Sequence, residues 1–410
     1  MKKKLKYFMF IVLMAITGLS IIIYSCVSDK TPQNTDNEVV LADIAPNDIG
    51  SAAFTVPQPF NNITAVDFVA DIKLGWNLGN TLDANGGSPS SSVSSLETLW
   101  VKHLTNNENI RTIKRAGFNT IRIPVSWAKT TTKAQDYKIP DAWMARVTEI
   151  VNYAVSYDMY IILNTHHDES IFTFMNNNTD AGLDAFKKIW TQIADNFKNY
   201  NEKLIFEALN EPRTKGSEYE WQGGTAAERA NLNKYYNTFV SVVRNSGGNN
   251  DKRFLLINTY AASVESSAMN GLVLPSDSAN KKLIVSYHSY APYNFALNTD
   301  KSFNKWSKSN SSDTSPITSG VDRAYNIFVS KGIPVILGEF GAMDKNNEET
   351  RAQWAEFYVG YAKSKGIPCV WWDNAGFTGN GELFGLIDRT KNSFPFPQVL
   401  NGLLTGAGLK

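Results

Sequence analysis

From about residue 60 onward, short apolar runs recur along the chain at intervals of roughly 30 to 50 residues. They are rich in β-branched residues and almost continuously apolar, which is typical of strands that are covered on both faces. Eight such runs are predicted as strands: LGWNLGN (74–80), NTIRIPV (119–125), YIILNTHH (160–167), LIFEALN (204–210), RFLLINT (253–259), LIVSYHSY (283–290), PVILGEFG (334–341) and CVWWDN (369–374).

Amphipathic segments with helical spacing lie between these runs, and several end at Gly just before the next run. They cover residues 107–117, 142–158, 182–200, 226–248, 323–332 and 351–366. Alternating strands and helices over about 350 residues predict α/β architecture, as a single (β/α)8 TIM barrel over 59–410. An open doubly wound sheet is the alternative, but no G-x-G-x-x-G follows a predicted strand, so dinucleotide binding loses its main support.

The first 26 residues differ in pattern from the rest of the chain. A basic start is followed by an apolar segment from Phe8 to Tyr24 and then by Ser-Cys, which is the order of a secretory signal peptide. Its end resembles a bacterial lipobox, so Cys26 is a candidate for lipidation; the apolar segment is also near the minimum for an uncleaved anchor. Residues 27–58 are polar and predict a tether. We therefore expect a secreted or cell-surface lipoprotein.

Composition adds limits. The formal net charge is +1, which gives no electrostatic case for nucleic acid or an acidic membrane surface as a partner. Cys369 is the only other cysteine and lies in an apolar run, so we expect it to be a small buried hydrophobe rather than half of a disulfide. Ten Trp residues would suit sugar binding, although cores use Trp too. Nothing calls for more than a monomer.

The carboxyl ends of the predicted strands carry most of the unusual polar and aromatic side chains. In a barrel these ends converge on one face, which is where active sites are built. Three of the four histidines lie there. The candidate site residues are Asn77, Arg122, Trp127, His166, His167, Asn210, Glu211, His288, Tyr290, Glu339 and Trp372, with Tyr293 close behind.

Two carboxylates, Glu211 after the fourth strand and Glu339 in the seventh, predict glycosidic bond cleavage. One protonates the leaving oxygen, and the other attacks the anomeric carbon or activates water; the sequence alone does not choose between these. We expect Glu339 to stay ionised beside Arg122 and Tyr290. We expect Glu211 to be protonated, with its pKa raised by burial and by Glu339. Asn210 would donate to the sugar 2-hydroxyl.

Each assignment has an alternative. Glu211 could simply begin a helix before Pro212, and Arg122 with Glu339 could be a structural ion pair. Trp372 could be core. The pair His166–His167 could bind zinc, but adjacent strand residues point to opposite faces, so both rings should not reach one ion. The sequence therefore predicts no metal and no cofactor.

Several motifs resemble glycoside hydrolase family 5: NEPR (210–213), GEFG (338–341), HSY (288–290) and NTIRIPVSW (119–127). The resemblance covers about residues 60–405. GWNLGNTLDA, HSYAPYNF and GELFGLIDR are similar to the branch that contains endoglucanases, lichenases and xyloglucanases. It implies a retaining mechanism, with Glu211 as acid/base and Glu339 as nucleophile, and no cofactor. Arg122, His166, Asn210, His288, Tyr290 and Trp372 match its other active-site positions. The loop VKHL (101–104) departs from its pattern.

The sequence thus predicts a retaining endo-β-1,4-glucanase that acts on polysaccharide: cellulose chains, mixed-linkage glucan or xyloglucan. Trp127, Tyr293 and Trp372 are expected to bind glucosyl rings along an open cleft. An endo-β-mannanase of the same fold, a non-catalytic glycan-binding surface lipoprotein and a zinc hydrolase are the alternatives.

Overall fold

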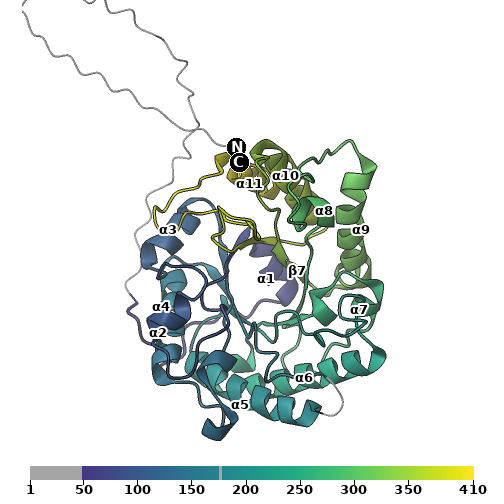
Figure 1. The fold of residues 1–410 in the computed structure, drawn as a ribbon. Helices are drawn as coiled ribbons and strands as arrows, with labels where there is room; N and C mark the ends of the chain where they lie inside the picture. The colour runs from purple at the N-terminus through teal and green to yellow at the C-terminus, as the bar shows by residue number, and fades with distance from the viewer. Residues whose placement is uncertain (1–48, 175–177) are drawn as a thin grey trace, which may run out of the picture. The chain divides into compact units, whose positions relative to one another are not determined.

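The computed structural model describes residues 49–174 and 178–410. The predicted signal peptide (1–26) and most of the predicted tether (27–48) lie outside these residues. Eight parallel strands hydrogen-bond in sequence order and close into a barrel (Figure 1), which confirms the predicted fold and excludes the open sheet. The strands are β1 (Gly75–Leu78), β2 (Thr120–Ile123), β3 (Tyr160–Asn164), β4 (Leu204–Glu207), β5 (Leu255–Asn258), β6 (Leu283–His288), β7 (Val335–Phe340) and β8 (Cys369–Asp373).

Helices surround the barrel (Figure 1). Six correspond to the predicted segments: α3 (Asn107–Arg115), α4 (Asp141–Ser156), α5 (Thr179–Phe197), α6 (Ala226–Arg244), α9 (Ser311–Ile327) and α10 (Glu348–Ser364). The chain also forms α2 (Val93–Glu97), α7 (Ser266–Asn270), α8 (Tyr293–Ala296) and α11 (Pro397–Ala407). The prediction for α9 began at residue 323, about three turns late, because the first half of that helix is rich in Ser and Thr and lacks an apolar stripe.

The amino-terminal end of the barrel is covered by α1 (Ala65–Asp71), a helix that the sequence pattern did not reveal. It starts at Thr64, whose side chain accepts a hydrogen bond from the Asp67 backbone N–H. Its apolar face packs against side chains from the interior of the barrel. This inner core contains Ala65, Phe68, Val69, Ile72, Ile162, Ile205, Phe254, Leu256, Ile284, Ile336 and Val370. The interior is therefore filled at this end, and only the opposite end is left for a site.

Residues 50–58, which the sequence assigned to the tether, are bound to the barrel domain. The side-chain amides of Asn152, Asn199 and Asn249 donate to backbone carbonyls of this segment at 2.8 to 3.1 Å. Asn152 lies inside α4, Asn199 follows α5, and Asn249 lies in a short 3-10 helix over Gly248–Asp251, so no single local pattern marks them as partners of this segment. The docked part of the chain therefore begins before the predicted boundary at residue 59.

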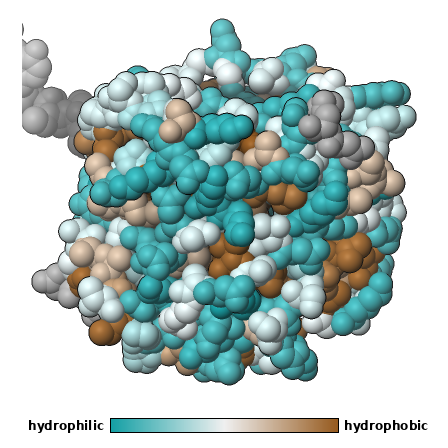
Figure 2. All heavy atoms as spheres, turned by 90° about the horizontal axis from the view of Figure 1, so that it is seen from below, coloured by the Kyte–Doolittle hydropathy of each residue, from teal (hydrophilic) through white to brown (hydrophobic). Residues whose placement is uncertain are grey.

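Cys369 is buried in β8, as predicted. On the face shown in Figure 2, hydrophobic residues occur in separate small patches among hydrophilic ones, which is ordinary for a globular domain. Within the described ranges, every helix is too short or too polar to cross a membrane.

Candidate active site

The guanidinium group of Arg122, on β2, is fully buried and occupies the centre of the site. Nε and Nη2 donate to Oε2 and Oε1 of Glu207, on β4, at 2.6 and 3.0 Å. Nη1 donates to Oε1 of Glu339 at 2.7 Å and to Oδ1 of Asn77 at 2.9 Å, and Nη2 also donates to Oδ1 of Asn210 at 2.7 Å. Burial by itself lowers the pKa of Arg122, but the attraction of Glu207 and Glu339 outweighs it and raises that pKa.

Glu339 lies on β7 and receives two hydrogen bonds. Arg122 donates to one oxygen, and the hydroxyl of Tyr290 donates to the other at 2.9 Å. Both contacts are the ones that the sequence led us to expect. The pairing of β7 shifts register on both sides, with β6 near His288 and with β8 before Phe340. Such irregularities re-aim side chains at barrel rims, and here they flank the carboxylate.

Glu211 faces Glu339 across the end of the barrel, although 128 positions separate them in the chain. His288 lies between them: its Nδ1 is 3.1 Å from Oε1 of Glu211 and 3.6 Å from Oε2 of Glu339. One oxygen of each carboxylate and one nitrogen of His288 all lie within 4.8 Å of one another. The two acidic groups therefore share one small space, which is the arrangement that glycosidic cleavage requires.

The predicted protonation of Glu211 is wrong for the free protein. Burial raises the pKa of Glu211, but the hydrogen bond and charge of His288, followed by the charge of Arg213, lower it further than burial raises it. Nη1 of Arg213 is 3.3 Å from Oε2 of Glu211. The prediction from the sequence included only burial and Glu339, because the convergence of two basic side chains on this carboxylate is a tertiary feature.

Asn210 and His166 each have one polar atom committed to the protein. Oδ1 of Asn210 accepts from Arg122, so its amide N–H groups are turned away from that arginine. Oδ1 of Asn164 accepts from the Val125 backbone N–H at 3.1 Å, so Nδ2 of Asn164 must be the donor to Nδ1 of His166, at 3.2 Å. It follows that neutral His166 carries its proton on Nε2. Burial keeps the ring neutral by lowering its pKa well below the usual value.

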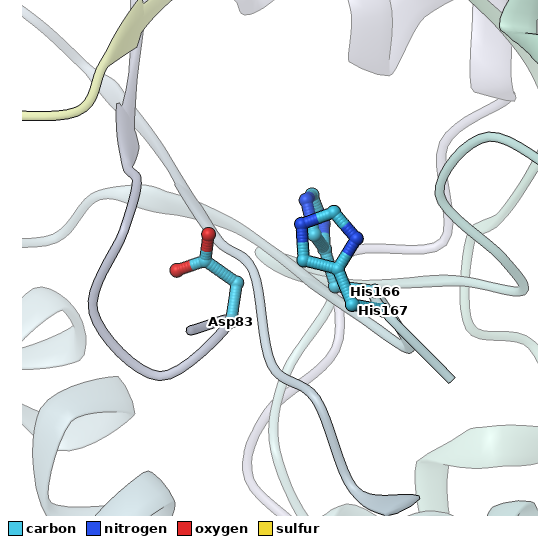
Figure 3. Close-up of side chains that lie close together, drawn as sticks. All are labelled: Asp83, His166 and His167. Carbon is cyan, nitrogen blue, oxygen red and sulfur yellow. The ribbon is translucent and has the colours of Figure 1, made fainter. Parts of the chain in front are cut away.

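Asp83, His166 and His167 lie close together (Figure 3), and one potential ligand atom from each falls within 4.8 Å of the others. The expectation that the two rings could not approach one ion is therefore wrong. The strand β3 ends at Asn164, so both histidines belong to the following loop, where strand alternation no longer applies.

The hydrogen bonds of this cluster nevertheless do not suit a metal. Nε2 of His166 carries a proton and offers no lone pair. Burial lowers the pKa of His167, but the carboxylate of Glu169, whose Oε1 lies 3.9 Å from Nδ1, and the charge of Asp83 raise that pKa above its usual value. Asp83 accepts two backbone N–H groups, at 2.7 and 2.9 Å. We interpret the cluster as a set of polar contacts that holds the loop after β3 in place.

The three predicted sugar-binding aromatic residues have different environments. Tyr293 begins α8 and is 63% exposed. Trp372 is mostly buried beside Phe384, and its ring lies parallel to that of His166, with centroids 5.8 Å apart. Trp127 is wrongly predicted, because it is fully buried in the main core and its indole N–H donates to the carbonyl of Asn164. An aromatic residue after a strand can thus turn into the core.

Several residues at or near the site were not predicted from the sequence. Glu207 was visible as a charge inside the apolar run LIFEALN, and Asn258 as a polar end to the fifth run. Trp221 gave no signal: it is 58% exposed in the loop after β4, and the guanidinium of Arg213 lies 4.4 Å from its ring centroid. A cavity of about 580 Å³ is lined by loops after the first four strands, including His167 and Arg213, and Nη1 of Arg213 also contacts Glu211.

The chain forms a closed (β/α)8 barrel, and two carboxylates, one after β4 and one on β7, meet at one end of it. This fold and this site together are those of a glycoside hydrolase. Residues 82–378 match the family model for cellulase, glycosyl hydrolase family 5. The chain belongs to that family and is an enzyme of the cellulase type.

Individual relatives agree. Endoglucanase B of Neocallimastix patriciarum is 43% identical over 361 residues, which cover 87% of this chain and 75% of the relative. A GH5-4 broad specificity endoglucanase from Ruminococcus champanellensis, solved with bound cellotriose, has a TM-score of 0.82 and 44% identity, covering 85% of this chain and all of that one. A family 5 lichenase from Caldicellulosiruptor sp. F32, solved with cellotetraose, has a TM-score of 0.81 and 40% identity, covering 86% and 98%.

Proposed function

We propose that this protein is a retaining endo-β-1,4-glucanase that cleaves plant β-glucans by double displacement. The observation that carries the proposal is the approach of Glu211 and Glu339, with one oxygen of each within 4.8 Å. Retaining glycosidases hold their two carboxyl groups about 5 to 5.5 Å apart, whereas inverting enzymes leave about 6.5 to 9.5 Å for a water molecule. The short spacing here supports retention.

In the first step, an oxygen of Glu339 attacks the anomeric carbon while the leaving glycosidic oxygen takes a proton from Glu211. The products are a glycosyl ester on Glu339, a carboxylate on Glu211 and a departing chain with a free hydroxyl. In the second step, water gives a proton to Glu211 and its oxygen to the anomeric carbon, which frees Glu339. Atoms and charges balance over the cycle.

The acid role requires a proton on Glu211 in the complex, although its pKa is lowered in the free protein. The side chain of Glu211 is 20% exposed, so its charged form still contacts solvent. An uncharged sugar that covers this carboxyl would remove the remaining water and favour the protonated form. Substrate binding would thereby prepare the acid.

The surrounding groups support the same chemistry. Arg122 and Tyr290 each donate a hydrogen bond to Glu339 and so fix the direction of its side chain. The free amide N–H groups of Asn210 are suited to the sugar 2-hydroxyl, and Nε2–H of His166 to a second hydroxyl. Trp372 and the exposed ring of Tyr293 would contact glucosyl rings.

The relatives and the amino-terminal pattern support a substrate class and a location. The endoglucanase and lichenase relatives, with cellotriose and cellotetraose bound in two solved structures, favour β-glucan over mannan. The pattern of residues 1–26 favours secretion, with attachment to the cell surface through a lipid on Cys26.

The proposal is tested by reducing-sugar release from soluble cellulose, mixed-linkage glucan, xyloglucan and mannan, with the Glu339→Gln variant as the matched control. We expect hydrolysis of at least one β-glucan, little of mannan, and a loss on the order of 10⁵-fold in the variant, because the nucleophile is gone. Retention of the anomeric configuration would be read by NMR of the first products. Faster cleavage of mannan, inverted products, near-normal rates in the variant or loss of activity in EDTA would each contradict the proposal.

A further inference from the structure

The second partner of Arg122 has no part in the chemistry described so far. Glu207 is a strand residue with a side chain that is only 1% exposed, and it binds the arginine more completely than Glu339 does. It accepts from Nε and Nη2 in a two-pronged pair, while Glu339 accepts from Nη1 alone. Two-pronged pairs between arginine and carboxylate are the stronger and more directional ones.

We propose that Glu207 is a positioning residue, which holds the guanidinium of Arg122 in place and keeps it neutralised while Glu339 changes charge during the reaction. This inference rests on the proposed function.

The orientation of Arg122 follows from this pairing. With one side of the guanidinium fixed on Glu207, a single N–H of Nη1 is presented to Glu339. The other oxygen of Glu339 accepts only the hydroxyl of Tyr290 among the hydrogen bonds of the described chain. Were Glu207 absent, the two-pronged side of Arg122 could turn to Glu339 and occupy both of its oxygens. A carboxylate held in that way would be a poorer nucleophile.

Charge conservation gives a second argument. When Glu339 becomes a glycosyl ester, it loses its negative charge, and the buried Arg122 loses one of its two anionic partners. A buried cation without a partner is strongly unfavourable. Glu207 is not consumed in either step, so Arg122 remains paired in the intermediate. Glu207, which does not react, therefore stabilises the intermediate in which Glu339 is esterified.

Asn258, on β5, fixes Glu207 in turn. The two N–H groups of its amide Nδ2 are shared among three acceptors: Oε1 of Glu207 at 2.7 Å, the carbonyl of Leu209 at 2.5 Å and that of Asn210 at 2.6 Å. One amide thus connects Glu207 to the backbone that leads directly into Asn210 and Glu211. The position of Arg122 and the end of β4 are set by the same contacts.

The test compares Glu207→Gln with Glu97→Gln in the full chain. Glu97 provides a matched control: it is buried, it forms the same two-pronged pair with Arg146 at 2.7 and 3.0 Å, and its partner is on α4 rather than in the site. The substrate is an aryl β-cellobioside with a good leaving group, which needs little help from Glu211. The readout is kcat and kcat/KM as functions of pH.

We expect Glu207→Gln to lower kcat about 10²-fold, because the guanidinium is misplaced and unpaired in the intermediate. We also expect the acidic limb of kcat/KM to move to lower pH, because Arg122 then acts on Glu339 alone. Glu97→Gln should lower the melting temperature but leave both the kcat of the folded enzyme and the acidic limb unchanged. A purely structural role for Glu207 would reproduce the control.

Glu207→Asp keeps the charge on a shorter side chain. It should lower kcat about tenfold while the acidic limb stays in place. If Glu207→Gln does not fold, this variant decides, because an unchanged kcat would overturn the positioning role. If the wild type hydrolyses β-glucan with retention but Glu207→Gln has the wild-type pH profile, the inference fails and the proposed function stands. If the wild type has no such activity, the proposed function has failed first.

Discussion

Each end of the barrel buries an arginine, and the two arginines differ in the groups that accept their hydrogen bonds. Arg122 lies at the carboxyl ends of the strands and is paired with two carboxylates. Arg253 lies just before β5, at the other end, and its donors reach the side chain of Asn250 and four backbone carbonyls, those of Phe197, Tyr200, Asn201 and Leu204. Both side chains are fully buried.

The pKa values of the two arginines shift in opposite directions for this reason. Burial lowers the pKa of Arg253 to about 9, since carbonyl dipoles compensate a cation less than an anion does. Glu207 and Glu339 raise that of Arg122 in spite of its burial. Carbonyl groups cannot change charge, so Arg253, at the amino-terminal end of the barrel, only fixes the loop between α5 and β4. Carboxylates can change charge, so the groups around Arg122, at the carboxyl-terminal end, can take part in a reaction.

The largest predicted effect separates these two roles directly. Arg122→Lys should lower kcat/KM about 10²- to 10³-fold, because a point charge cannot hold Glu207 and Glu339 together and aim both. Arg253→Lys should leave kcat/KM of the folded enzyme unchanged but lower the free energy of unfolding by about 3 kcal/mol, because buried carbonyls lose their donors. Steady-state kinetics and urea unfolding of both variants would show this. Equal effects on activity would mean that the two ends do not differ in the way described.

A second prediction concerns the carboxyl-terminal end of the barrel, where one buried carboxylate, Asp168, has no cation paired with it in the described part of the chain. Asp168 is buried; Oδ1 accepts from the backbone N–H groups of Trp127 and Ala128, whereas Oδ2 has no partner among the described residues. Burial raises the pKa of Asp168 from 3.8 to about 7. A raised folded-state pKa means that the protonated carboxyl is the stable form, so its contribution to stability is complete below pH 3.8 and is lost as pH rises towards 7.

Asp168→Asn should remove this loss. The stability of the variant relative to the wild type is expected to increase by roughly 2 to 4 kcal/mol between about pH 4 and pH 7, from urea midpoints measured across that range. An exposed surface carboxylate provides the control: Asp195→Asn, at a side chain that is 67% exposed, should not change the pH dependence. A parallel shift of wild type and Asp168→Asn at all pH values would contradict the prediction.

The smallest expected effect concerns two aromatic residues that the sequence placed in the same class. Trp127→Phe should lower the free energy of unfolding by about 1 to 3 kcal/mol, because it removes buried volume and the indole hydrogen bond, and it should leave KM unchanged. Tyr293→Ala should leave stability unchanged and raise KM for long cello-oligosaccharides a few-fold. Thermal melts and KM for short and long substrates would distinguish the two variants. If Trp127→Phe changed KM alone, Trp127 would be a substrate-binding residue, as the sequence predicted.

These differences show where sequence reasoning succeeds. The strands were predicted because a parallel strand buried on both faces has an apolar sequence over its whole length, which is a local property. The pairing of Glu211 with Glu339 followed from the barrel, since strand ends must converge once the sheet closes. Arg122 inside the apolar run NTIRIPV likewise indicated a buried cation that needs an anionic partner.

The helix α1, the second anion at Arg122 and the burial of Trp127 could not be predicted in the same way. A seven-residue helix has too few turns to show a periodic pattern. Glu207 is visible in the sequence as a charge within an apolar run, but only the register between β2, β3 and β4 places it against Arg122. The direction taken by the ring of Trp127 depends on the loop after β2, where neither strand nor helix periodicity holds.

By itself, then, the sequence determined the order of elements and the kinds of side chain at the strand ends, because each of these is encoded in neighbouring residues, whereas it left an open sheet as the alternative to the closed barrel. Only the tertiary structure decided the ionisation of Glu211 and the division of Arg122 between Glu207 and Glu339. The reason is that an electrostatic balance is a sum over groups from different strands, and its sign depends on distances of a few ångströms that no local pattern encodes.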